Sequence, residues 1–283
     1  WPLPFRQQRI EQLLESRPKH SIDDLRAMHG DILSLAALPV LPWLQRANAE
    51  HALAAAAKKA LEGFDGTMAA DRAAPLILWS WQRHLTQLVF ADELGAAYER
   101  MIVSRTLRDA LDGVLARNDA WWCDDKGTPQ VETCAMLADR AFALALDELR
   151  SAQGDDVGRW QWGRAHQARS EHRPFSRVKA LAPWFELRTP VGGDTFTVNV
   201  SRVLYKPDAA TGELYLDEHG PSLRALYDLG DPAQSRFIHS SGQSGMPWAT
   251  AYRSFMPLWV GVDYVSVFPR EAPVATLQLQ PAR

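Results

Sequence analysis

Apolar side chains recur every three to four positions through the first part of the chain, which is the spacing of one helical face. This pattern predicts a helix over residues 5–14, which an Arg-Pro pair ends. Ser21 and Asp24 predict the capped start of a second helix. Its apolar positions continue to Leu35, and Pro39 is expected to end it.

Three more helices are predicted in the first half of the chain. An alanine-rich helix is expected over residues 48–61, where a glycine follows closely. Residues 75–89 are apolar almost all round, so the helix they form is expected to be buried. Thr128 followed by Pro129 predicts an N-cap with proline at the first helical position, and this helix is expected to run to about Arg150.

After residue 155 the pattern changes to short β-branched runs between turns. Residues 195–203 alternate in polarity after a Gly-Gly turn signal, which predicts a strand. Trp160 and Trp162 are expected on one face of another strand. Further strands are predicted at residues 223–229, 236–240, 264–268 and 274–279, and loops at residues 208–212 and 217–221.

Composition supports the same division. Residues 1–150 hold 26 of the 40 alanines but only 6 of the 17 glycines. Alanine favours helices, whereas glycine accompanies turns between strands. We therefore expect an α+β fold with a mostly helical lobe over residues 1–155 and a β-rich segment over residues 156–283.

Charge and hydropathy exclude several classes of protein. The net charge of -3 gives no basic excess for general nucleic-acid binding. No apolar run reaches the roughly 18 residues of a membrane-spanning helix. With 283 residues the chain is long enough for a large core. It begins at Trp1 without a signal-peptide pattern, so we expect a processed or trimmed piece of a longer protein.

Two patterns have a catalytic interpretation and a simpler structural one. Gly242-Gln243-Ser244-Gly245 suggests a nucleophilic serine, but Met246 breaks the Gly-x-Ser-x-Gly motif, so a polar turn is favoured. His166, His172 and His239 offer three imidazoles to a zinc ion. Their spacing matches no short ligand motif, so hydrogen-bonded structural histidines are favoured over a metal site.

Cys123 and Cys134 leave two alternatives open. In an oxidising compartment they would close a local ring and stabilise it by roughly 2–3 kcal/mol, whereas in a cytosol they would stay reduced. Arg6 lies where a loop enters the first predicted helix, and pattern alone makes it a solvated first-turn residue. These observations describe an α-then-β globular piece without a self-sufficient catalytic set.

The order of several motifs resembles the penicillin acylase family, bacterial amidohydrolases with an N-terminal nucleophile. The resemblance covers essentially the whole chain, and its closing block is the most specific part. The motifs are Phe5-Arg6-Gln7-Gln8-Arg9-Ile10, Ser21-Ile22-Asp23-Asp24, Gly30-Asp31, Trp160-Gln161-Trp162-Gly163-Arg164-Ala165-His166, and His239-Ser240-Ser241-Gly242-Gln243-Ser244-Gly245-Met246-Pro247 with Tyr252 and Pro257-Leu258-Trp259. The segment between the two cysteines resembles the acyl-homoserine-lactone and aculeacin acylase branch, which prefers long aliphatic acyl groups.

The resemblance implies a chemistry that this chain does not complete. Family members are exported precursors that cut themselves into a small α-chain and a larger β-chain. The N-terminal serine of the β-chain attacks a linear amide, its own α-amino group acts as base, and a side-chain amide with a backbone N–H stabilises the oxyanion. Residue 1 here is Trp, so the serine, the oxyanion asparagine and any calcium ligands are expected upstream of this chain.

The resemblance also assigns roles within the chain. Arg6 matches the arginine beside the oxyanion asparagine, where a guanidinium would orient that amide. The late strands would complete a layer of the family's αββα sandwich, and the helical lobe would wall the acyl pocket. Export to the periplasm implies an oxidised Cys123–Cys134 pair, and no cofactor or metal is expected in this chain.

The expected partners are the upstream β-chain segment, the α-chain of the same precursor and a small N-acyl amide, with no nucleic acid and no membrane. An isolated fragment would expose apolar surface and edge strands. One alternative from another class stays open: the chain is a non-catalytic scaffold or binding module. That alternative predicts a stable, monodisperse monomer without hydrolytic activity.

Overall fold

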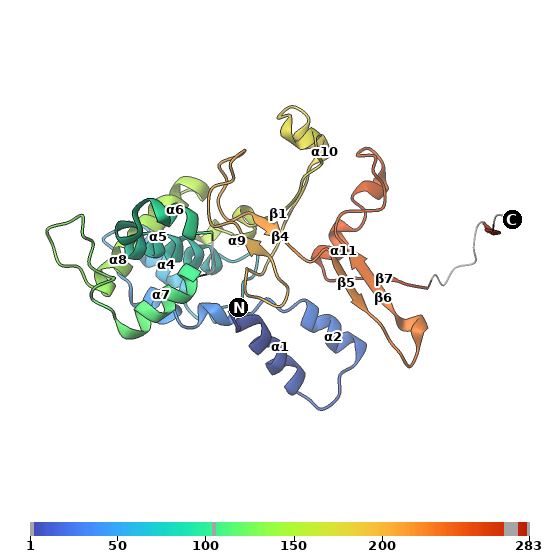
Figure 1. The fold of residues 1–283 in the computed structure, drawn as a ribbon, viewed down its shortest axis with the longest axis horizontal. Coiled ribbons are helices and arrows are strands. Elements are labelled where there is room, and N and C mark those ends of the chain that lie inside the picture. Colours follow the sequence, from blue (N-terminus) through green and yellow to red (C-terminus); the bar gives the residue numbers. More distant parts are fainter. Residues whose placement is uncertain (1–2, 104–105, 269–276, 282–283) are drawn as a thin grey trace.

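The computed structural model describes residues 3–103, 106–268 and 277–281, and it has a helical part beside two small sheets (Figure 1). The α+β class expected from the sequence is confirmed. The α-helices are α1 (Phe5–Glu15), α2 (Ile22–His29), α3 (Leu41–Arg46), α4 (Ala54–Leu61), α5 (Ala74–Leu94), α6 (Tyr98–Met101), α7 (Thr106–Arg117), α8 (Cys134–Gln153), α9 (Trp162–Ala165), α10 (Ala182–Phe185) and α11 (Met256–Val260). The strands are β1 (Gln167–Ser170), β2 (Leu187–Pro190), β3 (Arg202–Val203), β4 (Asp217–His219), β5 (Leu223–Leu226), β6 (Arg236–His239) and β7 (Val265–Ser266).

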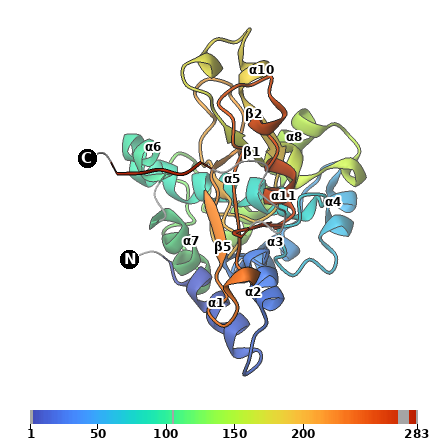
Figure 2. The ribbon, with the colours of Figure 1, turned by 90° about the vertical axis from the view of Figure 1, so that its right-hand side faces the viewer.

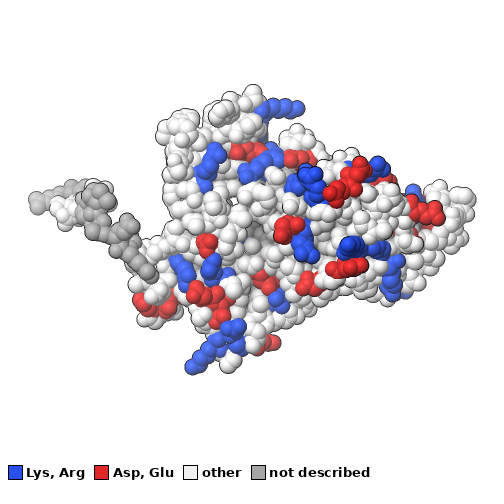
Figure 3. All heavy atoms as spheres, turned by 180° about the vertical axis from the view of Figure 1, so that it is seen from behind, with Lys and Arg blue, Asp and Glu red and all other residues white. Residues whose placement is uncertain are grey.

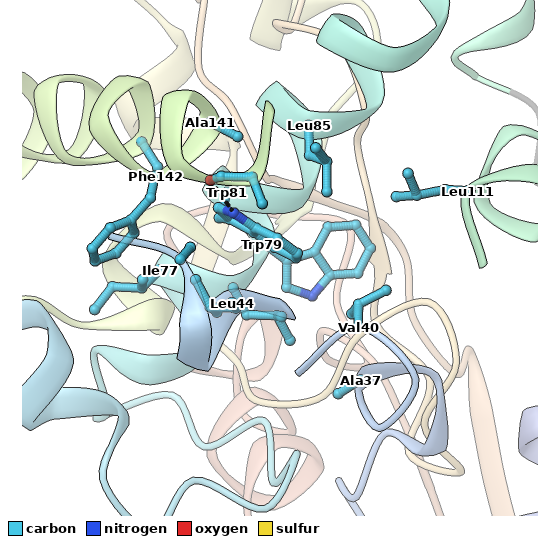
Figure 4. Packing of buried hydrophobic residues seen from close by; sticks show 14 of the residues in the cluster. Ala37, Val40, Leu44, Ile77, Trp79, Trp81, Leu85, Leu111, Ala141 and Phe142 are labelled. Carbon is cyan, nitrogen blue, oxygen red and sulfur yellow. Dashed lines mark hydrogen bonds between the residues drawn. The ribbon is translucent and has the colours of Figure 1, made fainter. Parts of the chain in front are cut away.

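The main core lies where α5 packs along α8, with α3, α4 and α7 around them (Figure 4). Trp81 of α5 is fully buried, and its Nε1 donates a hydrogen bond to the Ala138 carbonyl of α8 at 3.0 Å. Leu44 of α3 and Phe142 of α8 are also buried. The buried helix predicted over residues 75–89 is thereby confirmed, because an all-round apolar helix needs partners on every side.

The predicted start of α2 is confirmed, but its predicted length is not. Ser21 caps α2, and its side chain and that of Asp24 form the reciprocal capping box. The predicted continuation to Leu35 is wrong, because α2 ends at His29 with the Gly30 N–H bonded back to the carbonyl of Ala27. The next residues pair with another segment instead of prolonging the helix, through a bridge between Leu33 and Thr67.

Two other predicted starts are too early. The alanine-rich helix begins at Ala54 rather than at residue 48. The prediction of Thr128 as an N-cap is wrong, because α8 begins at Cys134 and Thr133 caps it, accepting from the Met136 N–H at 3.3 Å. Thr128 donates its hydroxyl to Glu132 within the preceding loop instead. The predicted run of this helix to about residue 150 is confirmed, since α8 ends at Gln153.

The strands form two sheets. The first has the order β2-β1-β4-β3, in which β1 and β2 are an antiparallel hairpin and β1 runs parallel to β4 at Ala168 and Asp217. The second has the antiparallel order β5-β6-β7. The strands predicted at residues 223–229, 236–240 and 264–268 are confirmed as shorter elements of this second sheet.

Three strand predictions and one loop prediction are corrected. Only Arg202–Val203 of the segment 195–203 is extended and paired, because Asp194 bonds the backbone N–H groups that follow it into a turn. Trp160 and Trp162 are buried, but Trp162 begins α9 because its N–H is paired with the Arg72 carbonyl. The expected loop over 217–221 begins with β4, whereas residues 208–212 do form a turn. Of the strand predicted at 274–279, residues 274–276 lie outside the described residues and the rest are not in a strand.

Helix α2 lies against the second sheet. Figure 2 shows α1 and α2 side by side below β5, and α2 contacts β5 directly. Arg26 of α2 bonds the Val262 carbonyl at 2.8 Å, and Arg236 of β6 pairs with Asp23 at 2.9 Å. Within the described ranges, no helix is both long and apolar enough to cross a lipid bilayer.

Candidate functional site

Arg6 lies in the first turn of α1 and is partly buried. Its Nε donates to the Thr197 carbonyl at 3.2 Å and its Nη2 to the Thr195 carbonyl at 2.9 Å. The ring of the neighbouring Phe5 meets Phe196 edge-on, with 5.8 Å between the centroids. The structure therefore places Arg6 against the segment 193–199 rather than in open solvent.

The acceptors of these two bonds determine what Arg6 can do. Both are carbonyl oxygens of the backbone, and two bonds from one guanidinium fix its direction. Arg9, one turn later, forms an ion pair with Asp31 through its Nη2 at 2.7 Å, and this hydrogen bond raises the pKa of Arg9. Arg6 is thus suited to orient a polar group, whereas Arg9 joins α1 to the residues after α2.

The segment that holds Arg6 is tied to both parts of the molecule. The Gly193 carbonyl accepts from Trp162 Nε1 at 3.0 Å, and the Gly193 N–H donates to the Met68 carbonyl at 2.8 Å. At the other end, Asn199 donates its N–H to the Asp31 carbonyl, and its Oδ1 accepts from Arg224 of β5 at 2.6 Å. Sequence reasoning missed this segment, because its alternating polarity imitates a strand.

The three histidines considered as zinc ligands have separate local partners. His166 is fully buried, stacks on Trp162 at 4.3 Å and bonds the Tyr215 carbonyl through Nδ1 at 2.6 Å. His172 stacks on a phenylalanine ring, and His239 bonds its neighbour's carbonyl. In the part of the chain that the structure describes, no group of three or more His, Cys, Asp or Glu side chains is placed to hold a metal ion.

The remaining sequence candidates are structural. Ser244 accepts a hydrogen bond from the Met246 N–H at 3.0 Å in the loop after β6, as the polar-turn interpretation expects. Cys123 and Cys134 form a disulfide with 4.9 Å between their Cα atoms, and both are buried. The disulfide joins the loop before α8 to the first residue of that helix.

A large open cleft lies beside the hairpin of β1 and β2, which with its connecting residues 171–186 we call the arm. The cleft has a volume of about 1060 Å³ and is lined on one side by the arm and on the other by α11. Next to it, Trp184 of the arm and Trp248 are 72% and 77% exposed. Most of the described tryptophan rings are buried or half-buried, so these two are exceptions.

Charge on the surface is mixed rather than segregated. On the face opposite to that of Figure 1, Lys and Arg side chains lie among Asp and Glu side chains (Figure 3). Ion pairs such as Arg202–Glu218 at 3.0 Å and Arg188–Glu213 at 2.6 Å account for part of this mixing. The pattern on this face lacks the continuous basic stripe typical of nucleic-acid-binding surfaces.

Comparison with known proteins places this geometry in context. A model of the penicillin amidase family matches residues 1–276. An acyl-homoserine lactone acylase, QuiP, from Pseudomonas aeruginosa is 27% identical over 306 aligned residues, which cover 95% of this chain and 35% of that protein. A penicillin acylase 2 proenzyme from Pseudomonas sp. (strain SE83) is 27% identical over 265 residues, covering 90% of this chain and 32% of the relative.

A similar fold is found among solved structures. A thermostable penicillin G acylase from Alcaligenes faecalis superposes with a TM-score of 0.55 at 13% identity, covering 99% of this chain and 54% of that chain. The likeness at this identity is one of fold. The chain spans about a third of the length of the curated relatives it matches.

Proposed function

Because the chain belongs to the penicillin amidase family, we propose that it is part of an amidohydrolase that cleaves linear amide bonds of N-acyl substrates. Relatives named acyl-homoserine lactone acylase and penicillin acylase support this substrate class. The acyl group would come from a β-lactam side chain or an acyl-homoserine lactone. The resemblance to the acyl-homoserine-lactone branch favours a long aliphatic acyl chain.

The proposed reaction uses a nucleophile outside this chain. An N-terminal serine upstream gives its hydroxyl proton to its own α-amino group while its oxygen attacks the amide carbonyl. The tetrahedral oxyanion is stabilised by an asparagine amide and a backbone N–H, and the amine then leaves with a proton. Water hydrolyses the acyl-enzyme ester and releases the carboxylic acid.

The orientation of Arg6 is the observation that carries the proposal for this chain. Its guanidinium is oriented by hydrogen bonds to the carbonyls of Thr195 and Thr197. In the proposed enzyme it orients the oxyanion asparagine and adds positive potential beside it. The helical lobe over residues 1–155 is proposed to wall the acyl pocket, and residues 156–283 to complete the αββα sandwich.

The proposed partners are the upstream β-chain segment and the α-chain of the same precursor. Exposed aromatic rings at Trp184 and Trp248 and the open edge of β5 support such an assembly, since large exposed apolar surface marks interaction sites. A structural calcium ion would take ligands upstream. We propose a periplasmic or secreted location, in which the Cys123–Cys134 disulfide is maintained.

The test uses the intact enzyme that contains this chain, with release of carboxylic acid from long-chain N-acyl-homoserine lactone and from benzylpenicillin as readout. Replacing Arg6 by Ala should lower kcat by about 10–100-fold, somewhat less than the loss of a direct oxyanion donor. Arg17→Ala, at an exposed arginine paired with Asp24, is the matched control and should leave kcat unchanged. An intact protein that releases no acid from either substrate would instead favour the scaffold alternative.

A further inference from the structure

The turn that holds Arg6 is built around one buried carboxylate. Asp194 is 2% exposed, and its Oδ1 accepts from the Phe196 N–H at 2.7 Å and from the Thr197 N–H at 3.1 Å. An aspartate that bonds the backbone two and three residues ahead forces the chain to fold back on itself. These bonds therefore set the path of the residues whose carbonyls receive Arg6.

Two threonines fasten the same turn to its surroundings. Thr197 Oγ1 accepts from the Asp194 N–H at 3.0 Å and donates to the Asn199 carbonyl at 2.8 Å. Thr195 Oγ1 accepts from the Val203 N–H at 3.1 Å, which joins the turn to β3. Both threonines are buried, so the turn is held by internal bonds rather than by solvent.

The residue before the turn shows how closely it is packed. Gly193 has a φ of +86°, in the region that residues with side chains rarely adopt. A Cβ atom there would lie 2.5 Å from the Asn199 carbonyl oxygen and 2.9 Å from Thr197 Oγ1. Only glycine therefore fits at the position where the chain enters this turn.

A buried carboxylate is costly because burial removes the water that solvates its charge. Burial raises the pKa of Asp194, and the backbone donors of Phe196 and Thr197, together with the side chains of Ser34 and Trp79, work against that shift by favouring the charged form. An apolar side chain would avoid this cost but would leave the two N–H groups without acceptors. The buried carboxylate thus lowers the stability of the fold but fixes the geometry of the turn.

We propose that Asp194 is a positioning residue for Arg6: its carboxylate fixes the 194–199 turn so that the Thr195 and Thr197 carbonyls aim the guanidinium. The link between Asp194 and the orientation of Arg6 rests on the hydrogen bonds alone. The effect of that orientation on catalysis rests on the proposed function. Asp194 itself touches no reacting atom. Its effect reaches the reaction only through Arg6.

The kinetic test is a double-mutant cycle in the intact enzyme. Asp194→Ala should lower kcat at least about tenfold with KM changed less than twofold, and Asp194→Asn, which keeps an Oδ1 acceptor for both N–H groups, should restore most of kcat. The double variant Arg6→Ala with Asp194→Ala should be no slower than Arg6→Ala alone. Losses that multiply independently would overturn the proposal.

A second measurement is independent of activity. Hydrogen–deuterium exchange of the intact protein should be faster in the peptides holding residues 195–199 and Arg6 when Asp194 is replaced by Ala, and close to wild type in Asp194→Asn. Glu132→Ala, which removes another buried carboxylate bonded to a backbone N–H, in the loop before α8, should leave exchange at Arg6 and kcat unchanged.

The two measurements separate the two proposals. Faster exchange at Arg6 together with unaltered kcat would support the structural link and contradict the catalytic role of Arg6. Unaltered exchange at Arg6 in Asp194→Ala would overturn the positioning role whatever the activity of the enzyme.

Discussion

Burial sets the charge of two residues in the β-rich part of the chain, His166 and Asp217. His166 is fully buried, and burial lowers its pKa to about 4, so the imidazole stacked on Trp162 is neutral at pH 7. Burial raises the pKa of Asp217 to about 6, although its Oδ1 accepts from the His219 N–H at 2.9 Å. Between about pH 4 and pH 6.5, the free energy of unfolding rises with pH because of His166 and falls with pH because of Asp217. The two effects therefore partly cancel in the wild type.

Replacing Asp217 by Asn separates these contributions. A raised pKa means that the carboxyl's contribution to stability is fully present below its unfolded-state pKa of about 4 and is lost as the pH rises through 6. Asp217→Asn keeps the acceptor for His219, so it should be more stable than wild type at pH 7 by up to about 3 kcal/mol. The gain should disappear below about pH 4. Between about pH 6.5 and pH 4 the stability of Asp217→Asn should fall as the pH falls, because the His166 imidazole takes up its proton in the unfolded chain before it does so in the folded one.

Urea unfolding from pH 4 to pH 7 measures this difference. Asp71→Asn, at an exposed aspartate, controls for the loss of one negative charge. A difference between Asp217→Asn and wild type that stays constant across this range would contradict the assignment of the raised pKa to Asp217.

At the scale of elements, the sequence predicts best where local pattern and packing agree. The apolar residues of α5 indicate a buried helix, and the β5–β6 hairpin follows its β-branched and apolar pattern. Prediction fails where contacts between residues far apart in the sequence determine the backbone conformation. The polarity of residues 195–203 is that of a strand, but the Asp194 carboxylate and the Arg6 guanidinium engage the backbone that a strand would need.

The sequence identifies Arg6 as a residue of the candidate site but does not identify the residues that orient it. Arg6 could be found from the family motif around it, since the motif matches residue by residue. The carbonyls of Thr195 and Thr197 could not, because nearly 190 residues separate them from Arg6 and backbone acceptors leave no trace in residue identity. Gly193 and Asp194 are the only local signals, and both are equally typical of an ordinary turn.

A polar network joins α5 to α8 inside the otherwise apolar lobe. Glu148 of α8 accepts from Ser80 Oγ at 2.7 Å and from the Tyr215 hydroxyl, and it pairs with Arg83. Burial alone would raise the pKa of Glu148, but the hydrogen bond from His84 and the charge of Arg83 outweigh burial and lower the pKa to about 2. The carboxylate therefore supports the helix pair only while it is charged.

Glu148→Gln tests this link between helices. A lowered pKa means that the stabilisation is present above the unfolded-state pKa of about 4.5 and is lost as the pH falls towards 2. The variant should be less stable than wild type by about 3 kcal/mol at pH 7, with the loss shrinking below pH 4. Thermal unfolding followed by circular dichroism measures it, with the exposed Glu62→Gln as control. Equal stability at pH 7 would show that the network is energetically neutral.

At the scale of the whole molecule, the helical lobe and the arm differ in how much aromatic surface they leave exposed. The helical lobe buries its large rings, as Trp81 and Phe142 show, whereas the arm and the loop before α11 project from the sheets with Trp184 and Trp248 exposed (Figure 1). The Tyr252 hydroxyl donates to the Phe185 carbonyl and joins these two projections. If the chain is part of the proposed enzyme, this surface is expected to bury its rings against the upstream segments.

Limited trypsin digestion tests that expectation. Arg177 and Lys179 lie exposed on the arm, so the 283-residue chain on its own should be cut there early, and the intact enzyme should resist cleavage at both residues because the arm is covered. Arg108, which is 2% exposed within α7, is the matched internal control and should survive in both samples until the lobe unfolds. Equal early cleavage at Arg177 and Lys179 in both samples would show that the arm stays exposed in the enzyme. Its tryptophans would then serve a partner other than the rest of the precursor.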